Sequence, residues 1–300
     1  MTSKVKITFL GTADQIPSKD RNHTAILLTY EGENILIDCG EGTQRQFRKA
    51  DLNPCKITKI LLTHWHGDHV LGFPGLLSTL ALSGYNKTLY IYGPKGTKKF
   101  VDELLRVFNF RKEYKIVVEE VSGKFFETKD FYLKAEKMEH GIPCYAYSFV
   151  KKGQLRIDKK KLERAKILSG PHLQNLKEGK DIIYEGKKYK SKDLTFQDSD
   201  LKVSFVLDTR ENNKIVSFVK DSDLFVCEAS YADDLKDQAK EHLHMTAKQA
   251  GDLAKKAKVK QLVLTHISQR YEKAPHIILD EAKKSFKNTI LVKDLDVLEV

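Results

Sequence analysis

The sequence lacks long hydrophobic runs and closely paired cysteines. No stretch reaches the roughly 18 apolar residues of a membrane-spanning helix, and the first residues lack the apolar core of a secretory signal. The four cysteines (Cys39, Cys55, Cys144 and Cys227) form no CxxC pair, which argues against a thiolate zinc site and against a disulfide framework. We therefore expect a soluble, cytoplasmic protein with no membrane association, whose cysteines are reduced and mostly buried.

Short apolar runs alternate with helical patterns along most of the 300 residues, which predicts an α/β fold with a substantial core. The expected strands are residues 5–10, 25–30, 35–38, 60–63, 89–92, 203–207, 224–227, 261–265 and 290–292. The expected helices are residues 41–50, 96–108, 246–257 and 275–284. In the second of these helices, Phe100, Leu104 and Phe108 recur at the spacing of one helical face.

Residues 151–192 break this alternation and carry most of the formal charge of +11, with 14 Lys and Arg against 5 Asp and Glu. Glycines punctuate the segment, and a short basic helix is expected over residues 158–168. Its apolar content is too thin for an independent core. We interpret it as an inserted basic arm within a single domain spanning residues 1–300. A basic run is usually just a solvated face. This run is a discrete insertion in a chain that also contains the candidate metal ligands described next, and that combination favours a polyanionic partner.

Four potential metal ligands lie within six residues, directly after the apolar run at 60–62. They are His64, His66, Asp68 and His69. Several imidazoles and a carboxylate so close together would repel or stay unsatisfied in a core, so divalent cations are the usual solution, and zinc suits this ligand set. The alternative is a solvated histidine-rich loop.

Three more candidates, His140, Asp208 and His266, also lie at the ends of expected strands. Sites in α/β sheets collect where strands deliver residues to one edge, so these side chains can converge with the histidine cluster. Taken singly, each has a structural interpretation, since a lone histidine is more often a satisfied structural residue and Asp208 could cap a turn. Their coincidence with the cluster favours a metal site.

The His-x-His-x-Asp-His motif with its downstream His, Asp and His resembles the metallo-β-lactamase superfamily. The resemblance covers the chain outside the basic arm and implies a four-layer αββα sandwich. It implies that one zinc ion is held by His64, His66 and His140. It implies a second zinc ion held by Asp68, His69 and His266, with Asp208 bridging the two and Asp38 as a supporting acid.

A pair of cations about 3.5–4 Å apart would lower the pKa of a bridging water to near neutrality and clamp the attacking and leaving oxygens at phosphorus. Asp68 would hold or orient the proton of the nucleophile while also serving as a ligand. The paired positive charge would stabilise the negative charge that gathers on the phosphoryl oxygens. Such a site suits phosphodiester hydrolysis.

Further motifs resemble the ribonuclease Z family, endonucleases that remove 3′ trailers from precursor tRNA. They are Gly11-Thr12 with residues 17–22, residues 38–46, Cys227-Glu228-Ala229-Ser230 and His244-Met245-Thr246-Ala247. By this resemblance His244 donates a proton to the departing 3′ oxygen and Glu228 holds its ring. Alternatively, His244 simply sits near a helix start and Glu228 pairs with a lysine. His242 lies two residues earlier, so an exchange of roles with His244 stays open.

The segment 151–192 matches the position of the family's flexible tRNA-binding arm, and residues 169–179 resemble its Gly-Pro and Leu-Lys-x-Gly landmarks. Its lysines would contact backbone phosphates, which gives affinity and register that weaken steeply with salt. Because the segment is poor in aromatic residues, we expect recognition of folded tRNA shape more than base stacking. The family is commonly a homodimer in which the arm of one subunit serves the other's site, so a homodimer is expected.

The leading hypothesis is a zinc-dependent endoribonuclease with two zinc ions per subunit. It would cut precursor tRNA just after the discriminator nucleotide, leaving a 3′-hydroxyl on the tRNA and a 5′-phosphate on the trailer. One alternative is a hydrolase of small phosphodiesters or other esters, with the arm serving solubility or assembly. Another is a non-catalytic RNA-binding protein that keeps zinc for structure. The motifs leave zinc, manganese and iron open as the metal in the cell.

Overall fold

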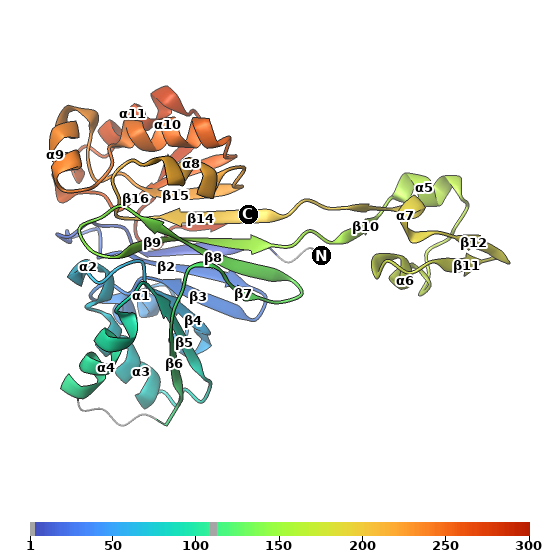
Figure 1. Cartoon of the computed structure of the whole chain (residues 1–300), viewed down its shortest axis with the longest axis horizontal. Helices are drawn as coiled ribbons and strands as arrows, with labels where there is room; N and C mark the ends of the chain where they lie inside the picture. Colours follow the sequence, from blue (N-terminus) through green and yellow to red (C-terminus); the bar gives the residue numbers. More distant parts are fainter. Residues whose placement is uncertain (1–3, 109–112) are drawn as a thin grey trace. The chain divides into compact units, whose positions relative to one another are not determined.

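The computed structural model describes residues 4–108 and 113–300, and it divides into two compact units. The larger unit comprises Met1–Phe126, Leu133–Phe149 and Lys202–Val300, and the smaller unit comprises Glu127–Tyr132 and Val150–Leu201. Within the described residues, two seven-stranded sheets form the frame of the larger unit (Figure 1).

The first sheet has the strand order β18-β1-β2-β3-β4-β5-β6. Its strands are β1 (Lys6–Gly11), β2 (Ala25–Tyr30), β3 (Glu33–Ile37), β4 (Lys59–Leu61), β5 (Leu89–Gly93), β6 (Ile116–Glu120) and β18 (Val297–Glu299). The pairs from β18 to β3 are antiparallel and those from β3 to β6 are parallel. Because its central strands are covered on both faces, they are nearly continuous apolar runs, as the sequence predicts.

The second sheet has the order β17-β16-β15-β14-β9-β8-β7. Its strands are β7 (Gly123–Glu127), β8 (Phe131–Met138), β9 (Cys144–Lys151), β14 (Leu201–Val206), β15 (Leu224–Glu228), β16 (Gln261–Thr265) and β17 (Thr289–Leu291). The strands from β14 to β17 pair in parallel. Their carboxyl ends therefore meet at one edge of the sheet.

Helices cover the outer face of each sheet in the larger unit (Figure 1). Those on the first sheet are α1 (Thr43–Lys49), α3 (Phe73–Leu82) and α4 (Thr97–Val107). Those on the second are α8 (Asn213–Val219), α10 (Ala247–Ala257) and α11 (His276–Ser285). The inner faces meet through contacts such as Tyr30 with Phe149, whose ring centroids are 5.5 Å apart. The result is the α/β sandwich of two mixed sheets expected from the sequence.

Short helices complete the larger unit: η1 (Pro54–Lys56), α2 (Gly67–Val70), η2 (Asp233–Leu235), α9 (Lys236–Glu241) and η3 (Gln269–Tyr271). Among the described helices, none combines the length and the hydropathy that a membrane span requires. All four cysteines are free, and Cys55 alone among them is not fully buried, which confirms their expected state.

The helix boundaries differ little from the expected ones, but the predicted apolar face of α4 is right only at Leu104, which packs against the core. Phe100 and Phe108 are 40% and 46% exposed, and the helix ends before Phe108. The buried face contains Thr97 and Val101 instead. Phe100 covers the Trp65 ring at 5.1 Å rather than entering the core.

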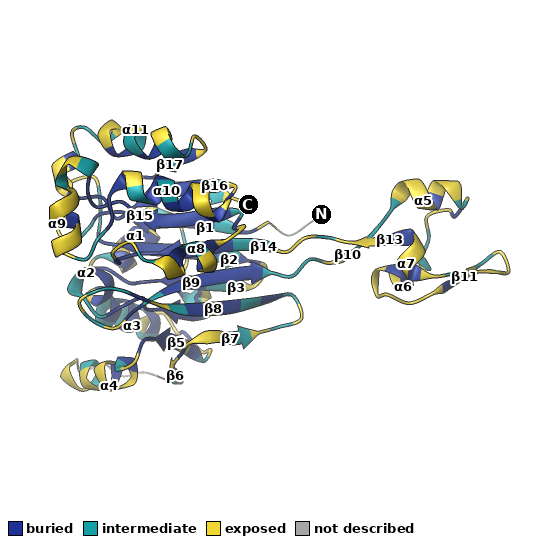
Figure 2. Cartoon of the chain, turned by 45° about the horizontal axis from the view of Figure 1, so that its top comes forward, coloured by how far each residue is buried: buried dark blue, intermediate teal, exposed yellow. Residues whose placement is uncertain are grey.

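The smaller unit contains β10 (Leu155–Ile157), α5 (Lys159–Arg164), α6 (Leu173–Lys177), β11 (Ile182–Tyr184), β12 (Lys187–Tyr189), α7 (Ser191–Leu194) and β13 (Thr195–Gln197). Its residues are mostly exposed or half-buried (Figure 2). It nevertheless has a small apolar cluster of its own, made by Leu162, Ile167, Leu176, Ile182 and Leu194. The expectation of no independent core is therefore wrong, because residues widely spaced in the segment gather around Leu176. The expected helix at 158–168 is also shorter than predicted, and Asp158 caps it by accepting from the Lys161 amide.

Candidate metal centre

All seven candidate ligands gather at the edge where strands of the two sheets end. His64 follows β4, His140 follows β8, Asp208 follows β14 and His266 follows β16. They form two groups that share Asp208, and within each group the ligand atoms lie within 4.8 Å of one another. The groups are His64, His66, His140 and Asp208, and Asp68, His69, Asp208 and His266. Both belong entirely to the larger unit.

The first group brings three ring nitrogens together. His66 Nδ1 lies 3.0 Å from His64 Nε2 and 3.1 Å from His140 Nε2. Asp208 Oδ2 lies 3.6 Å from His64 Nε2 and 4.0 Å from His140 Nε2. Lone pairs so close to one another repel unless a cation lies among them.

The second group alternates imidazoles with carboxylates. His69 Nε2 lies 3.1 Å from Asp68 Oδ2 and 3.3 Å from Asp208 Oδ1. His266 Nε2 lies 3.4 Å from Asp68 Oδ2 and 3.1 Å from Asp208 Oδ1. Asp208 therefore turns one oxygen toward each group, as a bridging ligand would.

The remote nitrogens of the buried rings have partners that fix their tautomers. His69 Nδ1 lies 2.6 Å from Asp38 Oδ2, and His140 Nδ1 lies 3.1 Å from the Leu243 carbonyl. Carboxylate and carbonyl oxygens only accept hydrogen bonds, so both Nδ1 atoms carry the proton. In the neutral form of each ring, Nε2 then presents a lone pair to the cluster. A protein-bound partner on the far nitrogen is the usual support of a metal-binding histidine.

Hydroxyl groups do the same for the other two rings. Thr63 Oγ1 donates to Asp38 Oδ2 and lies 3.0 Å from His64 Nδ1, which must therefore donate to it. Ser230 Oγ donates to Glu228 Oε2 and lies 2.9 Å from His266 Nδ1. Sequence reasoning missed Thr63 and Ser230 as supporting residues. Their positions directly before His64 and two residues after Glu228 were the available signals.

Asp38 is the supporting acid that the resemblance implies. Besides His69 and the Thr63 hydroxyl, its carboxylate accepts from the Thr63 amide at 2.7 Å. Asp38 and His266 both adopt left-handed backbone conformations, with φ of 56° and 57°. Non-glycine residues in that region are uncommon and concentrate at functional sites. Here the turn at the strand end aims each side chain at the centre.

Close backbone approach fixes the loop before α1 against α2, which carries Asp68 and His69. The Cys39 amide donates to the His69 carbonyl at 2.8 Å, and the Gly72 amide donates to the Cys39 carbonyl at 3.0 Å. A Cβ atom on Gly72 would collide with the Gly40 carbonyl. Glycine at this position therefore allows the contact that places the second group.

The charges of the two groups also fit divalent cations. Burial and the neighbouring His69 ring lower the pKa of His64 well below its usual value, so the ring is neutral. Burial opposes ionisation of Asp68, but the neighbouring His69 and His266 rings lower its pKa overall. Among the described residues, His69 Nε2 and Asp208 Oδ1 are buried polar atoms that form no hydrogen bond. Metal coordination would satisfy both atoms.

His244 lies beside the bridging carboxylate. Its Nδ1 is 3.0 Å from Glu228 Oε2, and its Nε2 is 4.0 Å from Asp208 Oδ2. Burial opposes protonation, but the Glu228 and Asp208 carboxylates raise the pKa of His244 to about 9. This shift favours the protonated ring, in which Nδ1 donates to Glu228 and Nε2 also carries a proton. Both His242 and His244 lie by Tyr231, with ring centroids 6.3 and 6.1 Å apart, and the contact with Glu228 is made by His244.

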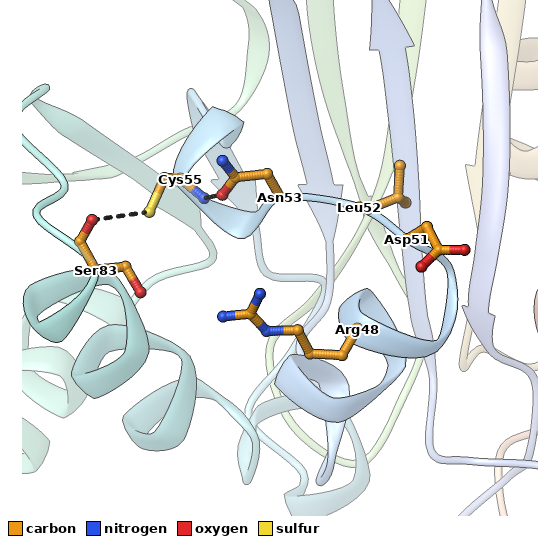
Figure 3. Close-up of a pocket in the computed structure, with 6 residues that line it drawn as sticks. All are labelled: Arg48, Asp51, Leu52, Asn53, Cys55 and Ser83. Atoms are coloured by element: carbon orange, nitrogen blue, oxygen red, sulfur yellow. Dashed lines mark hydrogen bonds between the residues drawn. The ribbon is translucent and has the colours of Figure 1, made fainter.

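A cavity of about 190 Å³ opens onto both groups. Its lining residues are Asp14, Gln15, His66, Asp68, His140, Asp208, Ser230, Tyr231, His242, His244 and His266. A separate hollow of about 450 Å³ is lined by Arg48, Asp51, Leu52, Asn53, Cys55 and Ser83 (Figure 3). Cys55 Sγ donates there to the Ser83 carbonyl, and the lining residues gather no set of metal ligands. The chemistry belongs to the first cavity.

Known proteins share the sequence and the fold of this chain. Ribonuclease Z of Listeria welshimeri is 38% identical over 304 residues, covering 99% of this chain and 99% of that protein. Ribonuclease Z of Nanoarchaeum equitans is 36% identical, covering 98% and 92%. The chain belongs to the ribonuclease Z family. The crystal structure of the short form of human tRNase Z superposes with a TM-score of 0.72 and 29% identity, covering 98% of each chain.

Membership of the ribonuclease Z family confirms the expected class: a hydrolase of the metallo-β-lactamase fold and an endoribonuclease of tRNA 3′ processing. A family model described as Anti-Pycsar protein Apyc1 matches residues 5–142, less than half of the chain. That stretch includes His64 through His140 but not Asp208 or His266. The buried histidine and aspartate groups are consistent with a binuclear metal site of this family.

Proposed function

We propose that the enzyme cuts precursor tRNA directly after the discriminator nucleotide, leaving a 3′-hydroxyl on the tRNA and a 5′-phosphate on the trailer. The observation that carries the proposal is that five of the seven candidate metal ligands line one small cavity together with His244. The printed names of the ribonuclease Z relatives support tRNA as the substrate.

We assign one zinc ion to His64, His66 and His140, and a second to Asp68, His69 and His266, with Asp208 between them. When bound, the two cations would supply charge compensation at phosphorus and a water whose pKa is near neutral. Neutral imidazoles and ionised carboxylates are the forms that such ions require. Asp68, held ionised by its neighbours, accepts or orients the proton of the nucleophile.

His244 serves as the general acid. Glu228 accepts a hydrogen bond from Nδ1–H, which turns Nε2–H toward the cavity. As the bond from phosphorus to the 3′ oxygen breaks, Nε2 gives its proton to that oxygen and a 3′-hydroxyl results. The oxygen of the attacking water forms the new bond to phosphorus. It therefore ends as part of the 5′-phosphate of the trailer. Glu228 then stabilises the ring and keeps it oriented, and His242 remains outside this step.

The basic segment 151–192 is proposed as the tRNA-binding arm. Its 14 Lys and Arg against 5 Asp and Glu suit a polyanion. Several of these lysines are strongly exposed, as at Lys180 and Lys188, which suits contacts to phosphates rather than to a protein core. Recognition of tRNA shape then precedes entry of the strand into the cavity.

By the family resemblance we also propose a cytoplasmic homodimer in which each arm serves the partner's site. Mixing two inactive variants tests the arrangement. Asp208→Ala subunits lack a working site, and subunits whose residues 154–197 are replaced by a short Gly-Ser linker lack an arm. A mixed dimer would combine an intact site with the partner's arm, so mixing should restore cleavage. Two variants that stay inactive together, although they associate in sedimentation, would contradict it.

The test of function is cleavage of an end-labelled precursor tRNA by the purified protein, with and without chelator. We expect one cut directly 3′ of the discriminator, loss of cleavage in chelator, and recovery when zinc is added. Metal analysis should give about two zinc ions per subunit. A cut elsewhere in the precursor, or cleavage that survives chelation, would overturn the proposal.

A further inference from the structure

His244 lines a second cavity as well as the one that opens onto the metal ligands. The second cavity has a volume of about 370 Å³. Its lining residues are Glu139, Arg210, Glu211, Asn212, Asn213, Lys236, Lys240, His244 and Gln249. No role in the proposed chemistry uses this cavity, although the proton donor forms part of its wall. Its volume lies within the range of small-ligand pockets.

The carboxylates in this wall are already engaged. Glu139 Oε2 accepts from Arg210 Nε at 2.7 Å, and Arg210 Nη2 lies 2.6 Å from the same oxygen. Glu211 accepts from Gln249 Nε2 at 3.0 Å and lies 3.9 Å from Lys256 Nζ. The negative charge of the wall is therefore balanced by its own partners.

The two lysines have no such balance. Lys236 and Lys240 are one helical turn apart on α9, so their side chains lie on the same face of the helix. Within the described part of the chain, neither forms an ion pair with a carboxylate. The cavity thus presents two ammonium groups that form no ion pair, and His244 lines the same cavity, a combination that suits a phosphate group.

The direction of the RNA strand follows from the role of His244. A proton donor to the departing 3′ oxygen must lie on the side of the nucleotide that carries that oxygen. The next phosphate in the 5′ direction belongs to the same nucleotide and lies one step farther from the metal ligands. The second cavity adjoins the donor on a wall that the metal groups do not share.

We propose that Lys236 and Lys240 bind the phosphate 5′ of the discriminator nucleotide and so position the scissile bond. This inference rests on the proposed function. The site recognises the RNA backbone rather than a base, because ammonium groups contact phosphate oxygens without reading sequence. Lys236 and Lys240 are positioning residues, since they do not touch the reacting atoms.

The test is steady-state cleavage of precursor tRNA by the double variant Lys236→Ala/Lys240→Ala. Its matched control is Lys283→Ala/Lys284→Ala, which removes the same charge from exposed positions on α11. We expect KM to rise about 10-fold or more in the first variant, as for loss of a charged hydrogen bond. The slope of log binding affinity against log salt concentration should become shallower by about one, the value for one phosphate contact. The variant Lys236→Arg/Lys240→Arg should have a KM close to that of the wild-type enzyme.

A chemically modified substrate locates the contact. We replace the phosphate 5′ of the discriminator by one uncharged methylphosphonate. With the wild-type enzyme, this precursor should show about the same rise in KM as the Lys236→Ala/Lys240→Ala variant shows with unmodified RNA. For the Lys236→Ala/Lys240→Ala enzyme, the modified and unmodified precursors should have similar KM values, because the contact is already absent. A methylphosphonate deep in the trailer is the matched control.

The outcomes separate the two proposals. If the wild-type enzyme fails to cut precursor tRNA, the proposed function is wrong and this inference falls with it. If the wild-type enzyme cuts correctly but the lysine variant behaves like Lys283→Ala/Lys284→Ala, only the phosphate site is wrong. The phosphate site would also be wrong if the methylphosphonate raised KM as much for the lysine variant as for the wild-type enzyme.

Discussion

The metal centre and the smaller unit use their polar residues in opposite ways. The side chains of His64 and His69 are 0% exposed, and hydrogen bonds to further buried groups fix their orientation. Lys180 and Lys188 in the smaller unit are 68% and 67% exposed and form only surface ion pairs. Ligands that must share a cation need fixed geometry before the substrate arrives. Cations that meet a polyanion keep their hydration and supply long-range attraction instead.

The first prediction concerns the buried ligands of the metal centre. Asp208→Ala removes the one carboxylate that faces both ligand groups. Cleavage of precursor tRNA under single-turnover conditions should fall by about 10³-fold or more, since several kcal/mol of transition-state stabilisation depend on the metal pair. Metal analysis should show fewer than two ions per subunit. Asp280→Ala, an exposed carboxylate on α11, is the matched control and should leave both values unchanged.

The second prediction concerns the proton donor at the edge of the centre. His244→Ala should lower the cleavage rate by roughly 10²–10³-fold, the usual contribution of a general acid, with metal content retained. Because His244 acts in its protonated form and its pKa is raised to about 9, the wild-type rate should fall as pH rises through that region. Glu228→Gln removes a charge that raises this pKa, so the alkaline limb should move to lower pH. A pH profile that is unaltered in Glu228→Gln would contradict the assignment.

The third prediction addresses the exposed side. Replacing residues 154–197 by a short Gly-Ser linker should weaken binding of precursor tRNA by about 10- to 100-fold at moderate salt and flatten its salt dependence. Filter binding over a salt series measures both, and metal content should stay at the wild-type value. Wild-type affinity in the armless protein would show that the lysines of this segment serve solubility rather than RNA binding.

The fourth and smallest effect sharpens the contrast between the two regions. Leu176→Ala opens a cavity in the apolar cluster of the smaller unit, at a local cost of about 2–5 kcal/mol. Hydrogen exchange should accelerate within residues 157–194 while the larger unit keeps its protection and its melting temperature. Leu168→Ala, which truncates a leucine that is 71% exposed, is the control and should alter neither. Equal loss of protection in both units would mean that they unfold together.

The sequence alone sufficed for the parts that depend on local pattern. The apolar runs predicted β2 at its observed residues, and the Thr246 position predicted the start of α10, where the Thr246 hydroxyl and the Gln249 side chain form a capping box. The His-x-His-x-Asp-His motif predicted a metal centre, because few other surroundings accept that many ligands in six residues.

Only the tertiary structure decided which side chains support those ligands. Thr63 and Ser230 have no distinctive pattern in sequence, because a single hydroxyl is informative only once its partners are known. The same reason applies to the small core around Leu176, whose members are too widely spaced to register as periodicity. Local periodicity and motifs are properties of neighbours along the chain. Packing and hydrogen bonding among residues up to two hundred positions apart are fixed only when the strands that carry them end at the same edge.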